Sequence, residues 1–576
     1  MRLAGVPGAF CKQEREKQMK KWWQKAVLYE IYLKSFYDQN GDGIGDLPGV
    51  LQKLPVLKEL GIDCIWFTPI YASPQVDNGY DVSDYRRIDP AYGTLEDFRR
   101  VLERAHELGI RVVMDQVLNH TSDEHYWFRE SRKSKDNPYR NYYIWQPPKA
   151  DGSEPNNWGS YFREGKGSAW EFDPGTGEYY LHQYSVKMPD LNWEYRPLRE
   201  EIYEMLRWWV SLGVDGFRLD IFTRLKKPEG FPDTRKEPDV LLDRNGFVVD
   251  KKMCTNVPGI HEIIHELYTE VFGPCGSYTV GEGAGVNSGN ALSYIGKERE
   301  ELDTVYHFEL AGRSKRSMKA EDFRRVQRAW YEVQKAGGWE TQHFSNHDSP
   351  RQVSSYGNDG EFRTASARLL AVLLLTTPGT PILYQGEEIG MVNVQYGRIE
   401  DYNDRYTVGD FRSMTEKGMD PEMALKRLAP ISRDNARTPY QWDDSPNAGF
   451  TEGTPWLKLN PRYPEINLKK DREDPDGVFS GYRTLIRIRR EHPVILDGTL
   501  RFYLEDDPAI VAYTRENEEE SLLVLANLSD EEVPLSLPRE LALRDWKPVF
   551  AGRPELDPSL AGKKSMAPWE SLVFLS

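Results

Sequence analysis

Short β-type runs alternate with amphipathic helical runs from Val27 to Tyr384, and this order is typical of βα units around a parallel sheet. The run Thr94–Leu108 shows the helical period most clearly, with apolar residues at Leu95, Phe98, Val101, Leu102 and Ala105. Gly109 follows it as a helix C-cap should, and Ile110 begins the next strand-like run. The alternation therefore predicts an α/β fold.

Eight runs have the composition of buried strands. They are Val27–Phe36, Ile62–Thr68, Arg111–Val117, Gly216–Phe222, Tyr278–Gly281, Thr304–Phe308, Thr341–Ser345 and Pro381–Tyr384. The helical runs between them include Pro48–Leu60, Thr94–Leu108, Arg196–Leu212, His261–Phe272, Ala320–Ala336 and Glu361–Thr377. Eight such units predict a (β/α)8 TIM barrel, in which catalytic side chains gather at the carboxyl ends of the strands.

Two regions depart from this alternation. Residues 121–190 are polar and aromatic with little helical period, and they are too long for an ordinary loop, so we expect an inserted subdomain after the third strand. After residue 498 strand-like alternation predicts a C-terminal antiparallel β-domain. Its expected strands are Leu500–Leu504, Ile510–Thr514, Ser521–Asn527, Leu572–Leu575 and an edge strand at Trp546–Phe550 that contains Pro548. The expected domains are an N-terminal extension (1–21), a barrel in two parts (22–120 and 191–497), the insertion (121–190) and a β-sandwich domain (498–576).

Carboxylates follow three of the predicted strands. Asp220 closes Gly216-Phe217-Arg218-Leu219-Asp220, Glu282 follows Tyr278–Gly281, and Asp348 lies just after Thr341–Ser345. Two carboxylates on neighbouring strand ends, one of them beside an arginine, are what glycoside hydrolysis by double displacement requires. The pattern therefore predicts a retaining glycoside hydrolase.

The composition of the chain argues against two classes of binding partner. The formal net charge of −16 argues against binding to nucleic acid or to an anionic membrane, both of which need clustered Lys and Arg. No stretch is apolar and long enough to span a bilayer, and residues 1–21 lack the apolar run of a signal peptide. Cys11, Cys64, Cys254 and Cys275 show no metal-ligand spacing and read as free thiols of a reducing compartment. We expect a cytoplasmic monomer that acts on a small oligosaccharide and has no organic cofactor.

Several motifs, taken in their order along the chain, resemble the α-amylase family, glycoside hydrolase family thirteen, and within it the oligo-1,6-glucosidase and α-glucosidase branch. The resemblance covers the chain from Trp22 to the C-terminus. Besides the strand ends, it rests on Asp77-Asn78-Gly79-Tyr80-Asp81, Arg111–His120, Met188–Glu194, Tyr384–Met391 and Arg433–Pro439.

The resemblance implies a role for each site residue. Asp220 is the nucleophile, and Arg218, on the same side of its strand, keeps it ionised. Glu282 is first the acid and then the base, and Asp348 holds and distorts the sugar. The remaining roles concern the same glucose unit: His120 and His347 donate hydrogen bonds to its hydroxyls, Tyr80 lies beneath its ring, and Asp77 and Arg351 pair to close the pocket. Such closure makes the enzyme exo-acting.

One loop has the ligand pattern of a cation site. Oxygen donors alternate with glycines in Asp38-Gln39-Asn40-Gly41-Asp42-Gly43-Ile44-Gly45-Asp46, although Gly49 stands where an EF-hand has its glutamate. The resemblance implies a structural Ca²⁺ or Mg²⁺ here. Its ligands would be Asp38, Asn40, Asp42, the carbonyl of Ile44, and Asp46. A metal-free turn rich in Asp and Asn is the alternative.

Substrate choice stays open at this point. Met188 stands where the branch usually has Gln. Ile221 follows Asp220, and in the resembling enzymes a bulky valine there accompanies α-1,6 linkages and a small residue α-1,4, so we expect isomaltose-type substrates. Arg313-Ser314-Lys315-Arg316 partly matches a loop of sucrose isomerases, with Lys315 in place of the aspartate. The alternatives are an α-1,4-glucosidase, a sucrose-active hydrolase or transglucosidase, and, more remotely, a non-catalytic amylase-like binding protein.

Overall fold

A computed structural model describes residues 21–162, 166–235, 241–242, 245–312 and 317–576. Residues 1–20 of the expected N-terminal extension and the Arg313–Arg316 run lie outside the described residues. Along the described ranges, no helix is both long and apolar enough to cross a membrane.

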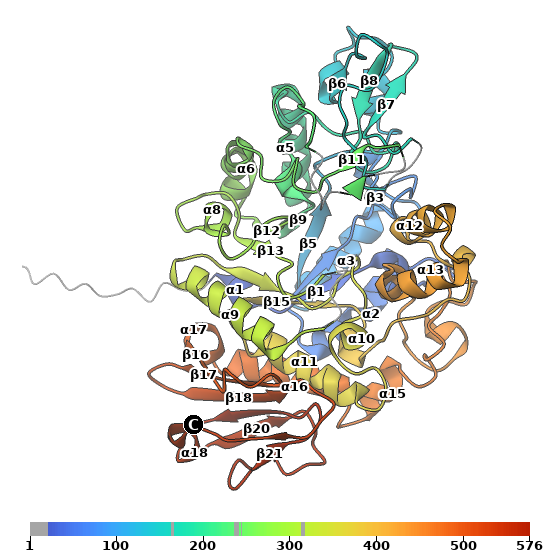
Figure 1. Cartoon of the computed structure of the whole chain (residues 1–576). Coiled ribbons are helices and arrows are strands. Elements are labelled where there is room, and N and C mark those ends of the chain that lie inside the picture. Colours follow the sequence, from blue (N-terminus) through green and yellow to red (C-terminus); the bar gives the residue numbers. More distant parts are fainter. Residues whose placement is uncertain (1–20, 163–165, 236–240, 243–244, 313–316) are drawn as a thin grey trace, which may run out of the picture.

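Eight parallel strands form a closed barrel at the centre of the molecule (Figure 1). In chain order they are β1 (Leu28–Ile31), β2 (Cys64–Phe67), β5 (Arg111–Gln116), β9 (Gly216–Leu219), β12 (Tyr278–Glu282), β13 (Thr304–Tyr306), β14 (Glu340–Gln342) and β15 (Thr380–Tyr384). Leu28 pairs with Cys64 on one side and with Ile382 on the other, which closes the barrel between its first and last strands. All eight predicted strands are confirmed. The predicted Val27–Phe36 was too long, because a 3-10 turn (Leu33–Ser35) follows β1.

The barrel strands have apolar side chains on both faces because both faces are covered. In β2 all four residues are buried. Trp66 joins a cluster inside the barrel with Val113, Val280 and Ile382, whereas Ile65 and Phe67 face the layer of surrounding helices. The alternation of side chains along one strand thus fills two separate parts of the core.

Helices surround the barrel at the predicted places. They include α2 (Leu47–Leu60), α3 (Leu95–Glu107), α5 (Arg196–Ser211), α6 (Ile260–Leu267), α9 (Ala320–Lys335) and α11 (Arg363–Leu375). Thr94 and Asp97 form a capping box at the start of α3, and Gly109 after its end has a φ of +71°. Phe98, Val101, Leu102 and Ala105 are its buried residues, as the helical period predicts. The predicted helix His261–Phe272 is α6 followed by a π-helical turn, Tyr268–Phe272.

A small subdomain is inserted between β5 and α5. It contains α4 (Tyr126–Ser131) and an antiparallel sheet of β6 (Trp145–Gln146), β8 (Glu178–Leu181) and β7 (Trp170–Asp173) in that order. Trp158, Trp170 and Leu181 belong to a separate apolar cluster that also contains Cys254, from the segment after β9. An isolated bridge pairs His120 with Asp190, so the two ends of the insertion meet at the barrel. In Figure 1 this sheet and the C-terminal sheet lie at opposite ends of the molecule.

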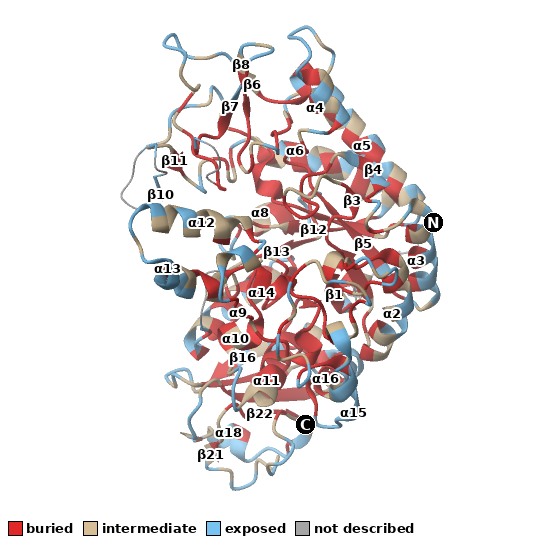
Figure 2. Cartoon of the chain, turned by 90° about the vertical axis from the view of Figure 1, so that its right-hand side faces the viewer, coloured by how far each residue is buried: buried red, intermediate tan, exposed pale blue. Residues whose placement is uncertain are grey.

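The C-terminal sheet has five antiparallel strands in the order β16 (Thr499–Tyr503), β17 (Ile510–Glu516), β18 (Ser521–Asn527), β22 (Ser571–Leu575) and β20 (Lys547–Ala551). As predicted, the strand that contains Pro548 lies at an edge, and its register is irregular between Pro548 and Phe550. Val511 and Tyr513 face the core shared with the barrel helices, and Ile510 and Ala512 face a separate cluster. Figure 2 shows the resulting burial, which is continuous from the barrel into this sheet.

Candidate active site

The predicted carboxylates come together at the carboxyl ends of the barrel strands. Asp220 follows β9, Glu282 ends β12, and Asp348 lies in the loop after β14. They line one cavity of about 260 Å³. Its other lining residues are Asp77, Tyr80, His120, Tyr161, Phe162, Tyr184, Met188, Ile221, Arg224, Lys251, Ala284, Tyr406 and Arg433.

One guanidinium holds the two central carboxylates. Arg218, which is 2% exposed, donates from Nη1 to Asp220 Oδ1 at 2.6 Å and from Nη2 to Glu282 Oε2 at 2.7 Å. The same Nη1 donates to both oxygens of Asp115, at 2.8 and 3.0 Å. Three carboxylates therefore share one cation. Asp115 was not among the predicted site residues, because its place within the β5 run looks like that of an ordinary strand residue.

The electrostatics of this group differ from the expectation that Arg218 alone keeps Asp220 ionised. Burial raises the pKa of Asp220 well above its usual range, the Arg218 charge opposes this, and the charges of Glu282 and Asp115 add to the rise. Burial also raises the pKa of Asp115 to about 6, against the effect of Arg218. The physical reason is that one positive charge cannot balance three neighbouring carboxylates, so the protonated form of Asp220 is favoured.

Asp348 has the opposite electrostatic environment. Burial acts to raise its pKa, but the charges of Arg433, His347 and Arg437 hold that pKa below the usual range. Arg437 Nη2 donates to Asp348 Oδ1 at 2.5 Å, and Arg433 Nη1 lies 3.4 Å from the same oxygen. The side chain of Asp348 is still 42% exposed because it faces the cavity. It is an ionised acceptor open to a ligand.

The predicted pairing of Asp77 with Arg351 is wrong. The partner of Asp77 is Arg433, whose Nη2 lies 3.1 Å from Asp77 Oδ1. Arg351 is 1% exposed and does not line the cavity. Its guanidinium points into the protein and donates to the backbone carbonyls of Gln385, Asn435 and Ala436 at 2.5, 3.1 and 2.9 Å. Three backbone carbonyls thus hold the Arg351 guanidinium away from the cavity.

Arg433 itself is the residue that the sequence analysis missed at this end of the cavity. It is 3% exposed and also pairs with Asp404 at 2.7 Å. Both Arg433 and Arg437 stand in the Arg433–Pro439 motif, so the signal was present as a pair of arginines four residues apart. That motif lies in a long segment without strand periodicity, and nothing in its spacing indicated which side chains reach the barrel.

His347 also differs from its predicted place. Its Nδ1 lies 2.5 Å from Glu30 Oε1 and its Nε2 lies 2.8 Å from the Tyr80 hydroxyl, and it is not among the cavity lining. The imidazole stacks on the Tyr80 ring, with centroids 5.3 Å apart. Both ring nitrogens are thus engaged by protein groups. His347 supports Tyr80 from behind, and Tyr80 is the side chain that lines the cavity.

His120 lines the cavity as predicted. Its Nε2 lies 3.1 Å from the carbonyl oxygen of Tyr80, and burial lowers its pKa to about 4. It is therefore neutral near pH 7. The bridge from His120 to Asp190 places it where the inserted subdomain joins the barrel.

Ile221 directly follows Asp220, the nucleophile candidate, and lines the cavity. Its φ of +34° is unusual for a β-branched residue, and such backbone strain persists only where the surroundings enforce it. In this conformation its backbone N–H donates to Glu282 Oε2 at 3.2 Å while its side chain lines the cavity. One strained residue thus contacts the acid candidate and shapes the space beside it.

The loop Asp38–Asp46 connects the turn after β1 to α2. Asp38 accepts hydrogen bonds from the backbone of Gly41 and Gly43 at 2.8 and 2.7 Å, and Asp46 caps α2 by accepting from Gly49 at 2.6 Å. Asp38 and Asp46 are 4% and 1% exposed, and neither forms an ion pair with a Lys or Arg of the described ranges. Among the described residues no three His, Cys, Asp or Glu side chains are arranged as a metal cluster. The donor types of the loop, carboxylate, amide and carbonyl oxygen, are those of a hard divalent cation.

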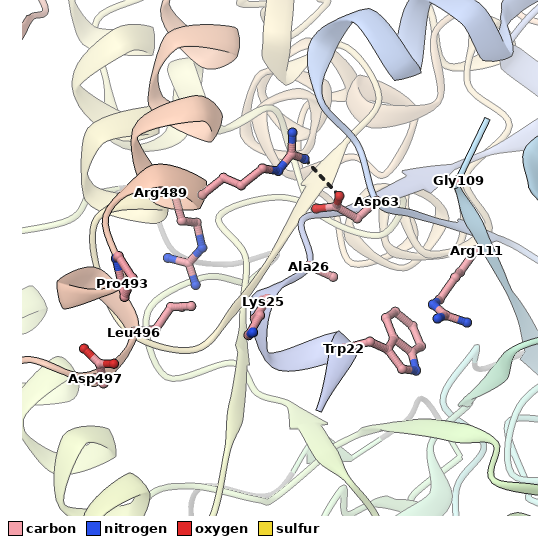
Figure 3. A pocket seen from close by; sticks show the side chains of 11 residues that line it. Trp22, Lys25, Ala26, Asp63, Gly109, Arg111, Arg489, Pro493, Leu496 and Asp497 are labelled. Atoms are coloured by element: carbon pink, nitrogen blue, oxygen red, sulfur yellow. Dashed lines mark hydrogen bonds and ion pairs between the residues drawn. The ribbon is translucent and has the colours of Figure 1, made fainter. Parts of the chain in front are cut away.

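A larger cavity of about 800 Å³ lies at the amino ends of the strands (Figure 3). Trp22, Arg111 and Arg489 border it, and Arg490 donates to Asp63 at 2.9 Å. Arg489 donates to three carbonyls around the end of α11, so it has a structural role. Because catalysis in this architecture occurs at the opposite, carboxyl ends, we assign the smaller cavity as the candidate active site.

The comparisons agree with this geometry. Residues 30–498 match the family described as "Alpha amylase, catalytic domain", and residues 500–555 match "Maltogenic Amylase, C-terminal domain". The chain is 45% identical to an oligo-1,6-glucosidase of Parageobacillus thermoglucosidasius, over 96% of this chain and 98% of that protein. Its structure is similar to trehalose-6-phosphate hydrolase of Bacillus licheniformis, with a TM-score of 0.89 and 40% identity over 96% of this chain and 100% of that one. It is equally similar to a trehalulose synthase, with a TM-score of 0.89 and 42% identity over 97% and 100% of the two chains. The chain belongs to the α-amylase family of glycoside hydrolases.

Proposed function

We propose that the protein is an exo-acting, retaining α-glucosidase that releases terminal glucose from short oligosaccharides and favours α-1,6 linkages. The observation that carries this is the Arg218 guanidinium, which holds Asp220 at 2.6 Å and Glu282 at 2.7 Å on its two amino groups. Retaining glycosidases keep their two carboxyl groups only ~5–5.5 Å apart, and binding of both carboxylates by one guanidinium supports such closeness. The 45% identity to an oligo-1,6-glucosidase supports the substrate class.

The proposed reaction begins with a redistribution of one proton. In the free protein burial raises the pKa of Asp220, and the nearby charge of Glu282 adds to this rise. A bound glycoside places its bridging oxygen at Glu282, which donates the proton as that bond breaks. Asp220, left ionised beside Arg218, attacks the anomeric carbon and forms the glucosyl-enzyme. Glu282 then removes a proton from a water molecule whose oxygen attacks the anomeric carbon, the bond to Asp220 breaks, and glucose leaves with its anomeric configuration retained.

The other cavity residues hold the glucose unit. Asp348, kept ionised by Arg433 and Arg437, accepts hydrogen bonds from its hydroxyls. Tyr80 provides an aromatic surface for the ring, and neutral His120 lies beside it. The Asp77–Arg433 pair closes the far end, so that only a terminal unit fits.

The stereochemical course is the direct test. NMR of the first product from isomaltose should show α-glucose, and β-glucose would reject the retaining mechanism. Asp220→Asn should remain folded and lose nearly all turnover. Release of maltose or longer fragments from the interior of starch would contradict the closed pocket. A hydrolysis panel of isomaltose, maltose, panose, sucrose and trehalose tests the linkage preference.

Transfer of the glucosyl unit to a second sugar is the other candidate function. It is favoured by the 42% identity to a trehalulose synthase, and it uses the same glucosyl-enzyme. The isomerase-like Arg313–Arg316 run lies outside the described residues. Isomaltulose or trehalulose among the products from sucrose would support transfer, and glucose with fructose alone would support hydrolysis.

We also propose that the Asp38–Asp46 loop binds a structural Ca²⁺ or Mg²⁺. Two nearly fully buried carboxylates, Asp38 and Asp46, carry no ion pair to a described Lys or Arg, and a buried charge without a counter-charge is costly. A bound cation would balance both. A chelator should lower the melting temperature, because a ligand that binds only the native state stabilises it. Equal melting curves with and without chelator, together with no metal by elemental analysis, would refute the site.

A cytoplasmic monomer remains our proposal for its location and assembly. Cys64, Cys254 and Cys275 are free thiols, as is usual in a reducing compartment. Cell fractionation and sedimentation of the purified protein test these two points.

A further inference from the structure

The cavity wall carries a cation that the proposed mechanism does not use. Arg224 belongs to the 3-10 turn Phe222–Arg224 directly after the nucleophile strand, and it is 6% exposed. Its Nη1 lies 3.3 Å from the Tyr184 hydroxyl and its Nη2 lies 3.5 Å from the carbonyl oxygen of Lys251. Its Nε is buried and donates to no acceptor within the described ranges.

Arg224 is also without a counter-charge. No Asp or Glu in the part of the chain that the structure describes forms an ion pair with it, in contrast to Arg218 and Arg433, which each pair with several carboxylates. The guanidinium instead lies over the rings of Tyr161 and Tyr184, at 4.4 and 5.9 Å from their centroids. A buried guanidinium without a carboxylate partner is unfavourable unless a ligand supplies the negative charge.

The aromatic side chains of the wall locate Arg224 on the side of the cavity away from Arg433. Arg433, at the closed end, lies 4.9 Å from the Tyr406 ring. From there ring contacts lead through Phe162 to Tyr184 and Tyr161, with centroid separations of 4.9, 5.6 and 5.1 Å. Arg224 lies at the other end of this series. A glucose unit at the closed end thus leaves the aromatic surface near Arg224 for the sugar on the other side of the cleaved bond.

We propose that Arg224 binds an anionic group on the leaving sugar, and that the preferred leaving sugar is a phosphorylated hexose. This rests on the proposed function, because it assumes that the closed end holds the glucose to be transferred. A guanidinium presents several donors in one plane and matches phosphate oxygens well. Lys251, which is exposed, lines the same cavity.

The test compares glucose 6-phosphate with glucose as inhibitors of p-nitrophenyl α-glucoside hydrolysis. Wild-type enzyme should bind glucose 6-phosphate at least ~10-fold more tightly, because hydrogen bonds between charged groups exceed those between neutral ones by about this factor in affinity. Arg224→Leu should abolish the preference, and Arg224→Lys should retain part of it. Equal inhibition of the wild-type enzyme by the two compounds would overturn the proposal, and this comparison needs no variant to fold.

A nearby cation provides the matched control. Lys226 is two residues further along, pairs with Glu194 and does not line the cavity, so Lys226→Leu should keep the full preference for glucose 6-phosphate. The same loss in both variants would overturn the assignment to Arg224. Glucuronate should inhibit less than glucose 6-phosphate, and equal inhibition would reject phosphate as the preferred anion. Failure of the wild-type enzyme to hydrolyse p-nitrophenyl α-glucoside would reject the proposed function and the inference with it, whereas normal hydrolysis with equal inhibition by the two compounds would overturn only the assignment of Arg224.

Discussion

Replacing Arg433 with alanine should open the closed end of the cavity and leave Asp220, Glu282 and Arg218 in place. Arg433 lies 3.1 Å from Asp77, 3.4 Å from Asp348 and 2.7 Å from Asp404, and its side chain is 3% exposed. Two of these carboxylates line the cavity and one, Asp404, is fully buried behind it. The substitution therefore affects both substrate binding and stability.

The two effects have different sizes and different readouts. Hydrogen bonds to charged groups contribute about 1.5–3 kcal/mol each, so losing the contacts that orient Asp77 and Asp348 should raise the barrier by ~3 kcal/mol, or about 100-fold in kcat/KM. The loss should be the same for isomaltose, maltose and p-nitrophenyl α-glucoside, because it concerns the glucose unit that they share. Removing the Arg433 charge from the buried Asp404 carboxylate should also reduce the free energy of unfolding by about 3–5 kcal/mol.

A buried arginine away from the cavity separates these effects. Arg368 is 5% exposed and donates to the carbonyls of Asp476, Gly477 and Ala551. Arg368→Ala should lower the melting temperature and leave kcat/KM near the wild-type value. The reasoning fails if Arg433→Ala keeps wild-type kcat/KM, or if its loss depends strongly on the leaving group.

Asp115→Asn removes one of the three carboxylates around Arg218, so the pKa of Asp220 should fall. The acidic limb of the pH–activity profile should then move to lower pH, and an unchanged profile would show that Asp115 is only structural. Burial lowers the pKa of His182 to about 4, so the unfolded chain binds a proton that the folded one does not between pH 6.5 and 4. As pH falls through that window, wild-type protein should lose up to about 3 kcal/mol of unfolding free energy relative to His182→Gln, measured by denaturant titration. Ile221→Ala should change the ratio of maltose to isomaltose hydrolysis, and an unchanged ratio would remove the sequence support for α-1,6 preference. Asp38→Asn should lower the melting temperature and abolish the effect of chelator, whereas a variant that still responds to chelator would place the cation elsewhere.

The barrel could be predicted because its signal is repeated. Each strand is a short apolar run, as in Cys64–Phe67, and each following helix carries its own period and caps, as Thr94 and Gly109 show for α3. In a closed barrel the carboxyl ends of neighbouring strands lie side by side, so the sequence alone predicts that Asp220 and Glu282 are neighbours.

The direction of side chains in the connecting segments could not be predicted. Arg351 stands in the expected loop, but the backbone carbonyls of Asn435 and Ala436 draw its guanidinium away from the cavity. Those carbonyls come from a segment that is distant in sequence and has no strand period. For the same reason the pairing of Asp77 with Arg433 had no signal in local spacing. Asp115 was missed because a buried carboxylate within a strand differs from its neighbours only through its contact with Arg218.

The bridge between His120 and Asp190 has a consequence for how this enzyme can change over time. Lys227, 4% exposed, lies 3.1 Å from Asp190, so the joint is also held by an ion pair. Because both ends of the insertion are fixed at one point, its closure entropy depends only weakly on its length. Residues can be added or lost between Thr121 and Pro189 without moving the barrel strands. Because the insertion also packs on residues outside it, as the Trp158–Val248 bridge shows, a graft would have to carry those contacts with it, and it would then alter the cavity wall while the carboxylates at the strand ends keep their geometry.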